Sequence, residues 1–451
     1  MTRACLRTTG AAGLVAAVLT LTGSAQAPHV YAIVGARVVT AAGPVIDSGT
    51  ILVRNGAIEA VGATVAVPPE AATIDGKGLT VYPGLIDMGT TAGLAIPPVE
   101  TPRDARTRME VERARRHDLI RAQVDAAALL KADAPELERL ASVGITSILA
   151  TPPGDGIRGR SALVNVAAGE DPPQIGNIAN ERAGMFVVSA PVALHVSFPG
   201  REGLGTYPAS LMGAIAFVRQ AFLDGGSYQR EMEKHGGANG NGRRPAYDAG
   251  LEALHPALRG SMPVVFEAGS AVEIRRVLSL AQEFKLRPVV SGAVGADAIT
   301  GELKSAGATV IYSLNYPVRP QALAPGADEP IRVIRERANA PKVPAALHKA
   351  GVPFVFASSG LREPADFVRN AAKAVKAGLP AEAAVRALTI EAATLAGAGR
   401  RLGSIEKGKQ ANLVITQGDL FDDKMVIRHV FVDGRPVSLT PAQADPPRRP
   451  R

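Results

Sequence analysis

The chain has 451 residues, of which 46% are hydrophobic and 20% are charged. These values are typical of a folded protein with a sizeable core, and they exclude a largely disordered chain. The net charge is +8, but the basic residues are dispersed and aromatic residues make up only 4%. Because no basic stretch is interleaved with aromatic residues, we expect no nucleic-acid binding.

The first 25 residues have the layout of a secretory signal peptide. A basic start is followed by an apolar stretch over residues 11–23 and then by small residues. We expect cleavage after Ala25, because cleavage after Ala27 would make Pro28 the first mature residue. An uncleaved membrane anchor is the alternative, and no later apolar run approaches the length of a membrane span. The expected location is periplasmic or secreted, with no membrane span after signal removal.

Cysteine and histidine usage limits the chemistry open to the mature chain. The single cysteine, Cys5, lies in the signal, so no disulfide, cysteine nucleophile or sulfur ligand for zinc is expected. No two of the seven histidines stand at the spacing His-x-His, His-x-x-His or His-Glu-x-x-His. Ser358 and Ser359 are weak candidates for a nucleophile, since no Gly-x-Ser-x-Gly turn is present.

Short β-segments separated by turns fill residues 31–81. Asn55 and Gly56 stand between two alternating apolar runs, which predicts a tight β-hairpin there. From residue 402 to residue 437 the chain returns to the same pattern. We therefore expect both chain ends to form one composite β-domain.

Between these ends, apolar strand runs alternate with amphipathic helices. Residues 136–151 predict a helix and a buried strand, residues 262–314 predict strand, helix, strand, helix and strand, and residues 348–361 predict a helix and a strand. Such repeats indicate parallel βαβ units. They favour a (β/α)8 barrel over a doubly wound sheet, because the chain has no dinucleotide fingerprint or phosphate loop.

Two segments interrupt this rhythm. Residues 95–134 are rich in charge, with a helix expected from Ala105 to Leu130, and residues 236–250 have the composition of an exposed loop. The expected domain division is a signal at 1–25, β-sandwich parts at 26–81 and 391–438, a barrel at 82–390, and a disordered tail at 439–451.

Three blocks carry a family resemblance. They are "VYPGLIDM" at residues 81–88, "ALTIEAATLAGAGRRLGSIEKGKQANLVI" at 387–415 and "VFVDGRPV" at 430–437. Together they resemble the amidohydrolase superfamily, in particular its secreted imidazolonepropionase-like members. The resemblance covers about residues 31–437. It implies a (β/α)8 barrel with a β-sandwich built from both chain ends, and hydrolysis of non-peptide C–N bonds by metal-activated hydroxide.

The resemblance also implies metal ligands that this chain lacks. Active members end the first barrel strand with Asp-x-His-x-His, where both imidazoles bind one divalent metal, zinc or another. Here Asp87 is kept, but Gly89 and Thr91 stand at the two histidine positions. Later family positions for two histidines and an aspartate fall near Glu267, Ser291 and Ser359. We therefore expect no metal cofactor.

The sequence thus predicts a pseudoenzyme of the amidohydrolase superfamily, with no catalytic residue. It would bind a small ligand at the strand ends, or pair with an active relative, as a homo- or hetero-oligomer. The alternative is an active cyclic-amide hydrolase with a rebuilt metal site using Glu267, His195 and Asp87. The expected residues of the ligand pocket are Asp87, Gly89, Thr91, His195, Glu267, Ser291 and Ser359.

Overall fold

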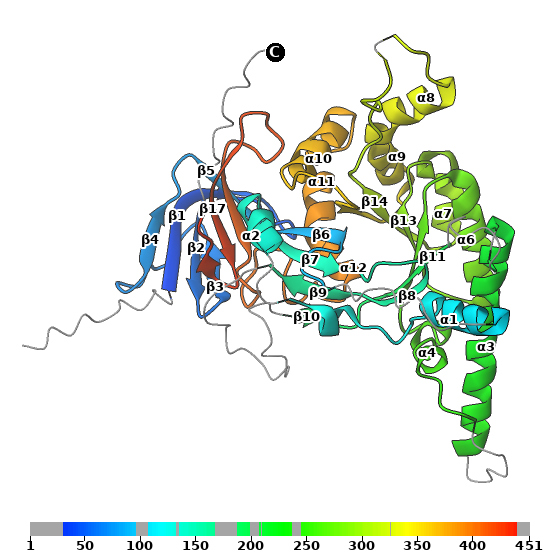
Figure 1. The fold of residues 1–451 in the computed structure, drawn as a ribbon. Coiled ribbons are helices and arrows are strands. Elements are labelled where there is room, and N and C mark those ends of the chain that lie inside the picture. The colour runs from blue at the N-terminus through cyan, green and yellow to red at the C-terminus, as the bar shows by residue number, and fades with distance from the viewer. Residues whose placement is uncertain are drawn as a thin grey trace, which may run out of the picture.

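The computed structural model has a mixed α/β fold with three β-sheets (Figure 1). It describes residues 30–95, 107–131, 135–166, 187–198, 207–208, 210–236, 245–324 and 326–439. The expected signal peptide and nearly all of the expected tail lie outside these residues. Within them, no helix is long and apolar enough to cross a membrane.

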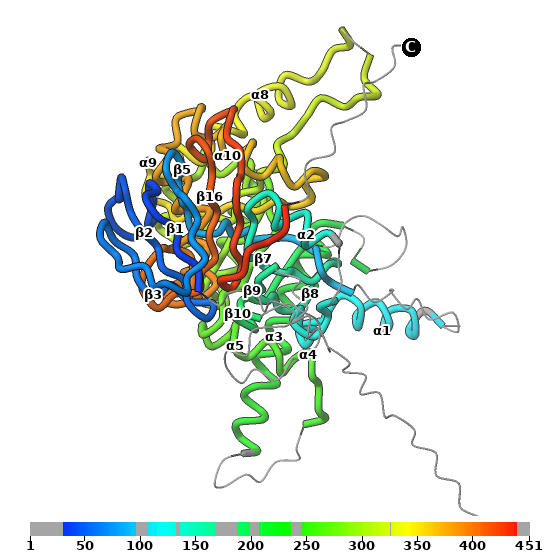
Figure 2. The backbone as a smooth tube through the Cα atoms, turned by 90° about the vertical axis from the view of Figure 1, so that its left-hand side faces the viewer, coloured from blue at the N-terminus to red at the C-terminus, as the bar shows by residue number. Residues whose placement is uncertain are grey.

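One sheet of eight strands is built from both ends of the chain, in the order β18-β17-β16-β5-β1-β2-β3 with β4 paired to β1. Figure 2 shows these early and late strands, blue and red, side by side. The hairpin expected at Asn55-Gly56 is confirmed, with both residues at positive φ (50° and 84°) between β2 and β3. The strands are β1 (Val30–Val38), β2 (Ile46–Arg54), β3 (Ala57–Gly62), β4 (Ala72–Asp75), β5 (Leu79–Pro83), β16 (Leu413–Gln417), β17 (Val426–Val432) and β18 (Arg435–Pro436).

Two further sheets occupy the middle of the chain, one of four strands in the order β10-β9-β7-β6 and one of six in the order β15-β14-β13-β12-β11-β8. β6 and β7 pair in parallel, as do the neighbours from β11 to β15. The strands are β6 (Leu85–Thr90), β7 (Ile145–Ala150), β8 (Gly156–Arg160), β9 (Ala162–Asn165), β10 (Val187–Ser189), β11 (Leu194–Ser197), β12 (Val264–Ala268), β13 (Pro288–Gly292), β14 (Thr309–Ser313) and β15 (Phe354–Ala357).

The expected repeats of strand and helix are confirmed, because α2 precedes β7, α6 and α7 connect β12, β13 and β14, and α9 precedes β15. α6 begins with a capping box, in which Ser270 and Glu273 accept each other's backbone N–H. The helices are α1 (Arg108–Leu119), η1 (Ala126–Leu129), α2 (Pro135–Ser142), α3 (Leu211–Gly236), α4 (Ala249–Glu252), α5 (His255–Leu258), α6 (Ala271–Phe284), η2 (Ala296–Ile299), α7 (Thr300–Ser305), α8 (Ile331–Asn339), η3 (Ala340–Lys342), α9 (Val343–Ala350), α10 (Asp366–Lys376), α11 (Ala381–Leu388) and α12 (Ile390–Leu395).

The helix expected from Ala105 to Leu130 is shorter than the sequence indicates. α1 ends at Leu119, and the backbone of Ile120 is no longer helical, with φ −118° and ψ 86°. The chain then runs beside β8, where Arg121 N donates to Ile157 O at 2.8 Å. Pairing with a strand edge therefore replaces the helical hydrogen bonds.

Alternation along the central strands separates two buried layers. One apolar cluster collects inward side chains of both sheets, among them Met88, Leu149 and Val265. Strand residues whose side chains point to the other face of the sheets, such as Phe266 of β12, pack instead with the helices. The two sheets therefore share one interior, which fixes where their strand ends point.

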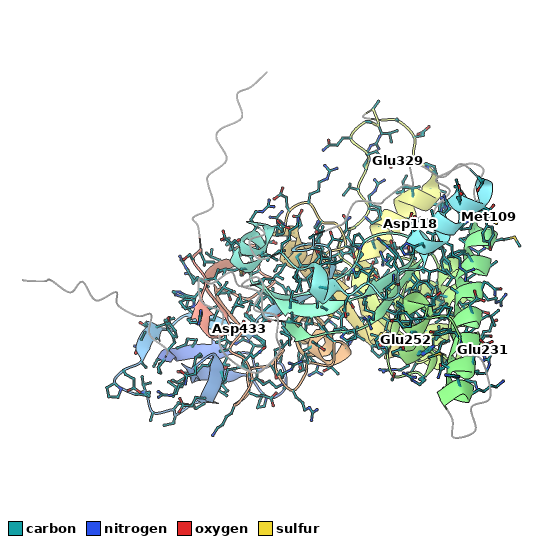
Figure 3. The ribbon with its side chains drawn as sticks, turned by 60° about the horizontal axis from the view of Figure 1, so that its bottom comes forward. Met109, Asp118, Glu231, Glu252, Glu329 and Asp433 are labelled. Carbon is teal, nitrogen blue, oxygen red and sulfur yellow. The ribbon has the colours of Figure 1, made fainter. Side chains whose placement is uncertain are left out.

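A buried polar network joins the terminal sheet to the four-stranded sheet. Asn165 Oδ1 accepts from Ser147 Oγ (2.7 Å) and Asn412 Nδ2 (3.0 Å), while Asn165 Nδ2 donates to Asp433 Oδ1 (2.6 Å). Asp433, labelled in Figure 3, is 7% exposed, and burial raises its pKa to about 6. The network therefore holds a carboxyl group whose charged form is disfavoured.

Candidate functional site

Asp87 ties the end of β6 to the segment after β15. Its carboxyl group is fully buried, and Oδ1 accepts from Ser358 N at 2.8 Å and Gly89 N at 3.1 Å. Oδ2 has no hydrogen-bond partner among the described residues. Burial raises the pKa of Asp87 to about 6, although the hydrogen bonds to Oδ1 act in the opposite direction. The arrangement makes Asp87 a clamp between two strands.

The structure brings the expected first-strand and last-strand positions together. Ser359 N donates to Gly89 O at 3.2 Å. A Cβ atom built on Gly89 would lie 3.2 Å from Ala357 Cβ and 4.0 Å from Ser359 Oγ. Thr91 and Ser359 are exposed to solvent, so this end of the strands is open.

His195, Glu267 and Ser291 come from neighbouring parallel strands. On β11, Leu194 and Val196 pack with the helices, so His195 faces the interior of the sheets. Glu267 pairs with Ser291 in the register of β12 and β13. His195 is 2% exposed, and its Nε2 has no partner in the part of the chain that the structure describes. Burial, aided by the charge of Arg158, holds the pKa of His195 well below its usual range, so the ring is neutral at pH 7.

Arg158 is the residue of this region that the sequence analysis missed. It lies on β8, and its Nη1 is 3.2 Å from Glu267 Oε2. The Arg158 side chain is 14% exposed and that of Glu267 is 58% exposed. The only signal in the sequence is an arginine between the apolar Ile157 and Gly159, in "GIRGR". Glu267 is therefore already paired with a cation.

Among the described residues, the side chains at these strand ends are not arranged as a metal centre. Asp87 uses one oxygen on two backbone N–H groups, and Glu267 is paired with Arg158. Throughout the described ranges, no group of three or more His, Cys, Asp or Glu side chains is placed to hold a metal ion. Zinc takes three or four such ligands in proteins. The combination of Glu267, His195 and Asp87 is not such a group.

None of the seven expected pocket residues lines either of the two pockets described next. The smaller one, about 10 Å³, is enclosed by apolar side chains at the interior of the sheets. The larger one, about 400 Å³, lies between α1 and α3, which an ion pair of Arg116 and Asp224 also connects. Its lining is Glu112, Arg116, Ile120, Tyr207, Phe217, Gln220, Ala221 and Asp224.

Comparisons with known proteins agree with this fold. The sequence model of the Amidohydrolase family matches residues 317–437. Amidohydrolase tasK of Hapsidospora irregularis is 24% identical over 403 residues, which cover 86% of this chain and 39% of that protein. The structure of an amidohydrolase from Thermotoga maritima MSB8 matches with a TM-score of 0.72 and 23% identity, over 90% of this chain and 99% of that one. Together these matches support membership of the amidohydrolase superfamily.

A further solved structure is similar to this chain in fold alone. A prolidase complexed with N-methylphosphonate-L-proline matches with a TM-score of 0.52 and 17% identity, over 90% of this chain and 99% of that chain. The present chain spans about two fifths of the length of the curated relative. The resemblance to the amidohydrolase superfamily drawn from the sequence is confirmed.

Proposed function

We propose that this protein is an exported pseudoenzyme of the amidohydrolase superfamily, which binds a small ligand at its strand ends and does not carry out metal-dependent hydrolysis. The ion pair between Arg158 and Glu267 carries the proposal. At the position where the resemblance places a metal-binding histidine, the chain has a carboxylate whose partner is a guanidinium.

The chemistry of the remaining positions supports the same conclusion. Gly89 offers no side-chain donor, while Thr91, Ser291 and Ser359 offer hydroxyl groups, which are poor ligands for a transition metal. A guanidinium beside Glu267 also repels a divalent cation. Without a metal, the pKa of a bound water stays far above neutral instead of falling to about 7, so hydroxide is scarce at neutral pH.

The architecture that the resemblance implies is part of the proposal. We place a closed (β/α)8 barrel at residues 82–390 and a composite β-sandwich at residues 26–81 and 391–438. The hydrogen bond from Ser359 N to Gly89 O supports closure, because it connects the end of the six-stranded sheet to β6. Ser161 alone separates β8 of one sheet from β9 of the other, which supports a continuous ring.

Metal content is the test of the pseudoenzyme. After dialysis of the purified protein against zinc, elemental analysis should find no stoichiometric metal, and amides, lactams and cyclic ureas should not be hydrolysed above background. Glu267→Ala and His195→Ala serve as matched variants. One metal ion per chain that is lost in either variant would overturn the proposal and favour the rebuilt metal site.

Export and partners need separate measurements. Intact-mass analysis of the envelope fraction should find a mature start near Gln26, and full-length protein in the cytosol would contradict export. Size-exclusion chromatography with light scattering measures whether the protein forms a homo-oligomer. An active amidohydrolase co-purifying in fixed ratio would identify the partner as a relative instead of a small ligand.

A further inference from the structure

Arg158 has hydrogen-bonding capacity that the described residues do not use. Its contact with Glu267 is its only ion pair there, and its Nε is buried without a partner. A guanidinium has five N–H donors, and leaving buried donors unpaired is costly. Glu267 is reached through Nη1, so the Nε–H donor of Arg158 is left without a partner among the described residues.

Arg121 approaches the same strand ends from the segment after α1. Its Nη2 donates to Pro153 O at 2.6 Å, and its Nε is buried without a partner among the described residues. Gly154 makes this approach possible, because a Cβ there would lie 2.2 Å from Arg121 Nη2. Ser197, two residues beyond His195 on β11, donates from Oγ to Gly154 O at 3.4 Å. The loop around Gly154 therefore lies between Arg121 and the end of β11.

His195 adds a third unused polar atom at this place. Its ring is 2% exposed and faces the interior on the strand between β8 and β12. Nε2 has no partner in the described structure. In the pairing of β8 with β11, His195 is opposite Gly159, and on the other edge of β8 Arg121 N donates to Ile157 O, so Arg158 stands between these two residues along the sheet. Each of the three side chains has a buried nitrogen atom without a partner among the described residues.

We infer that Arg158, assisted by Arg121, binds the carboxylate of a small anionic ligand, and that Glu267 occupies Arg158 as an internal substitute when the ligand is absent. Planar guanidinium groups bind carboxylates through two parallel N–H···O bonds. The Glu267 side chain is 58% exposed, so it can move into solvent while the Arg158 side chain, 14% exposed, stays in place. The inference rests on the proposed function, since it names the class of ligand at the same strand ends.

Because Glu267 and the ligand carboxylate compete for Arg158, removing the charge of Glu267 should raise the affinity for the ligand. Titration calorimetry with N-acetylglycine as the probe should give binding that Glu267→Gln strengthens about 10-fold, because the competing carboxylate is removed (about 1.4 kcal/mol). Glu302→Gln is the matched control. Glu302 pairs with Arg275 on the surface at 2.8 Å, and its loss should leave the affinity unchanged.

Variants that lack the guanidinium of Arg158 or of Arg121 provide the second test. Arg158→Gln and Arg121→Lys should each weaken binding of N-acetylglycine, the first by 10-fold or more. Glycinamide, which has no carboxylate, should not bind. Unchanged affinity in Glu267→Gln, or equal affinity in Arg158→Gln with a native circular dichroism spectrum, would overturn the inference. Tighter binding of inorganic phosphate than of N-acetylglycine would overturn the choice of a carboxylate.

Failure here differs from failure of the proposed function. A protein that binds neither zinc nor the probe contradicts the carboxylate site alone. A protein that binds one zinc ion contradicts the pseudoenzyme, whatever the probe does.

Discussion

Replacing Asp87 by asparagine should remove a pH dependence of stability that this residue imposes. Burial raises the pKa of Asp87 from 3.8 to about 6, which corresponds to a cost of about 3 kcal/mol for the charged form. Because the folded pKa is above the unfolded one, the folded state binds more protons between about pH 4 and pH 6. Stability therefore falls as the pH rises through this window. Between pH 5 and pH 7, Asp87 alone should account for a loss of about 1.3 kcal/mol.

Asparagine keeps the acceptor oxygen that receives the N–H groups of Ser358 and Gly89, while it carries no charge. We expect Asp87→Asn to be at least as stable as the parent at pH 7, and its loss between pH 5 and pH 7 to be smaller by about 1.3 kcal/mol. Urea unfolding at the two pH values measures this difference. Asp433→Asn should reduce the pH dependence of stability by a similar amount, because the pKa of Asp433 is also raised to about 6. An unchanged pH dependence in Asp87→Asn would refute the reasoning, as would a large loss of stability at pH 7.

The remaining predictions concern packing and the buried network. Gly84→Ala should cost 2 kcal/mol or more, because the new Cβ would lie 2.0 Å from Thr146 Oγ1 (overpacking costs about 1–3 kcal/mol). Gly301→Ala on α7, where a Cβ meets open space, is the control and should be neutral or stabilising in the same urea titration. Asn165→Ala should cost about 2 kcal/mol or more, because it leaves the buried Asp433 without its donor. A loss below about 0.5 kcal/mol would contradict that role.

Local patterns explain which parts of the fold were predictable. The strand and helix of β12 and α6 follow from a β-branched run and from Ser270 and Glu273 at capping-box spacing. The end of α1 was missed, because the alternation of apolar and polar residues over 120–125, which pair with the edge of β8, is too short to be distinguished from a continuing helix. β8 was missed for a related reason, since it is short and rich in glycine and pairs antiparallel to β11.

The candidate site also has one contact that could be predicted from the sequence and one that could not. The meeting of Gly89 with Ser359 could be predicted from their places on the first and last strands of the repeat. The contact between Arg158 and Glu267 could not, because it depends on the order of β8, β11 and β12 in space. Nothing in the spacing of "GIRGR" indicates that Arg158 lies beside a glutamate of another strand.

The sheet shared by the two chain ends has a consequence for synthesis. β5 pairs with β16, and Tyr82 OH donates to Asp419 at 3.3 Å across 337 positions of sequence. At about 5–20 residues per second, a ribosome needs roughly 20 s to a minute to make the partner after β5 has emerged. Throughout that interval one edge of β5 has no native partner, and open edges are sites of wrong association. The N-terminal strands therefore lack their partner for at least the time that the rest of the chain takes to be made, and a protein exported as proposed needs a holding chaperone that covers these strands until the whole chain can fold.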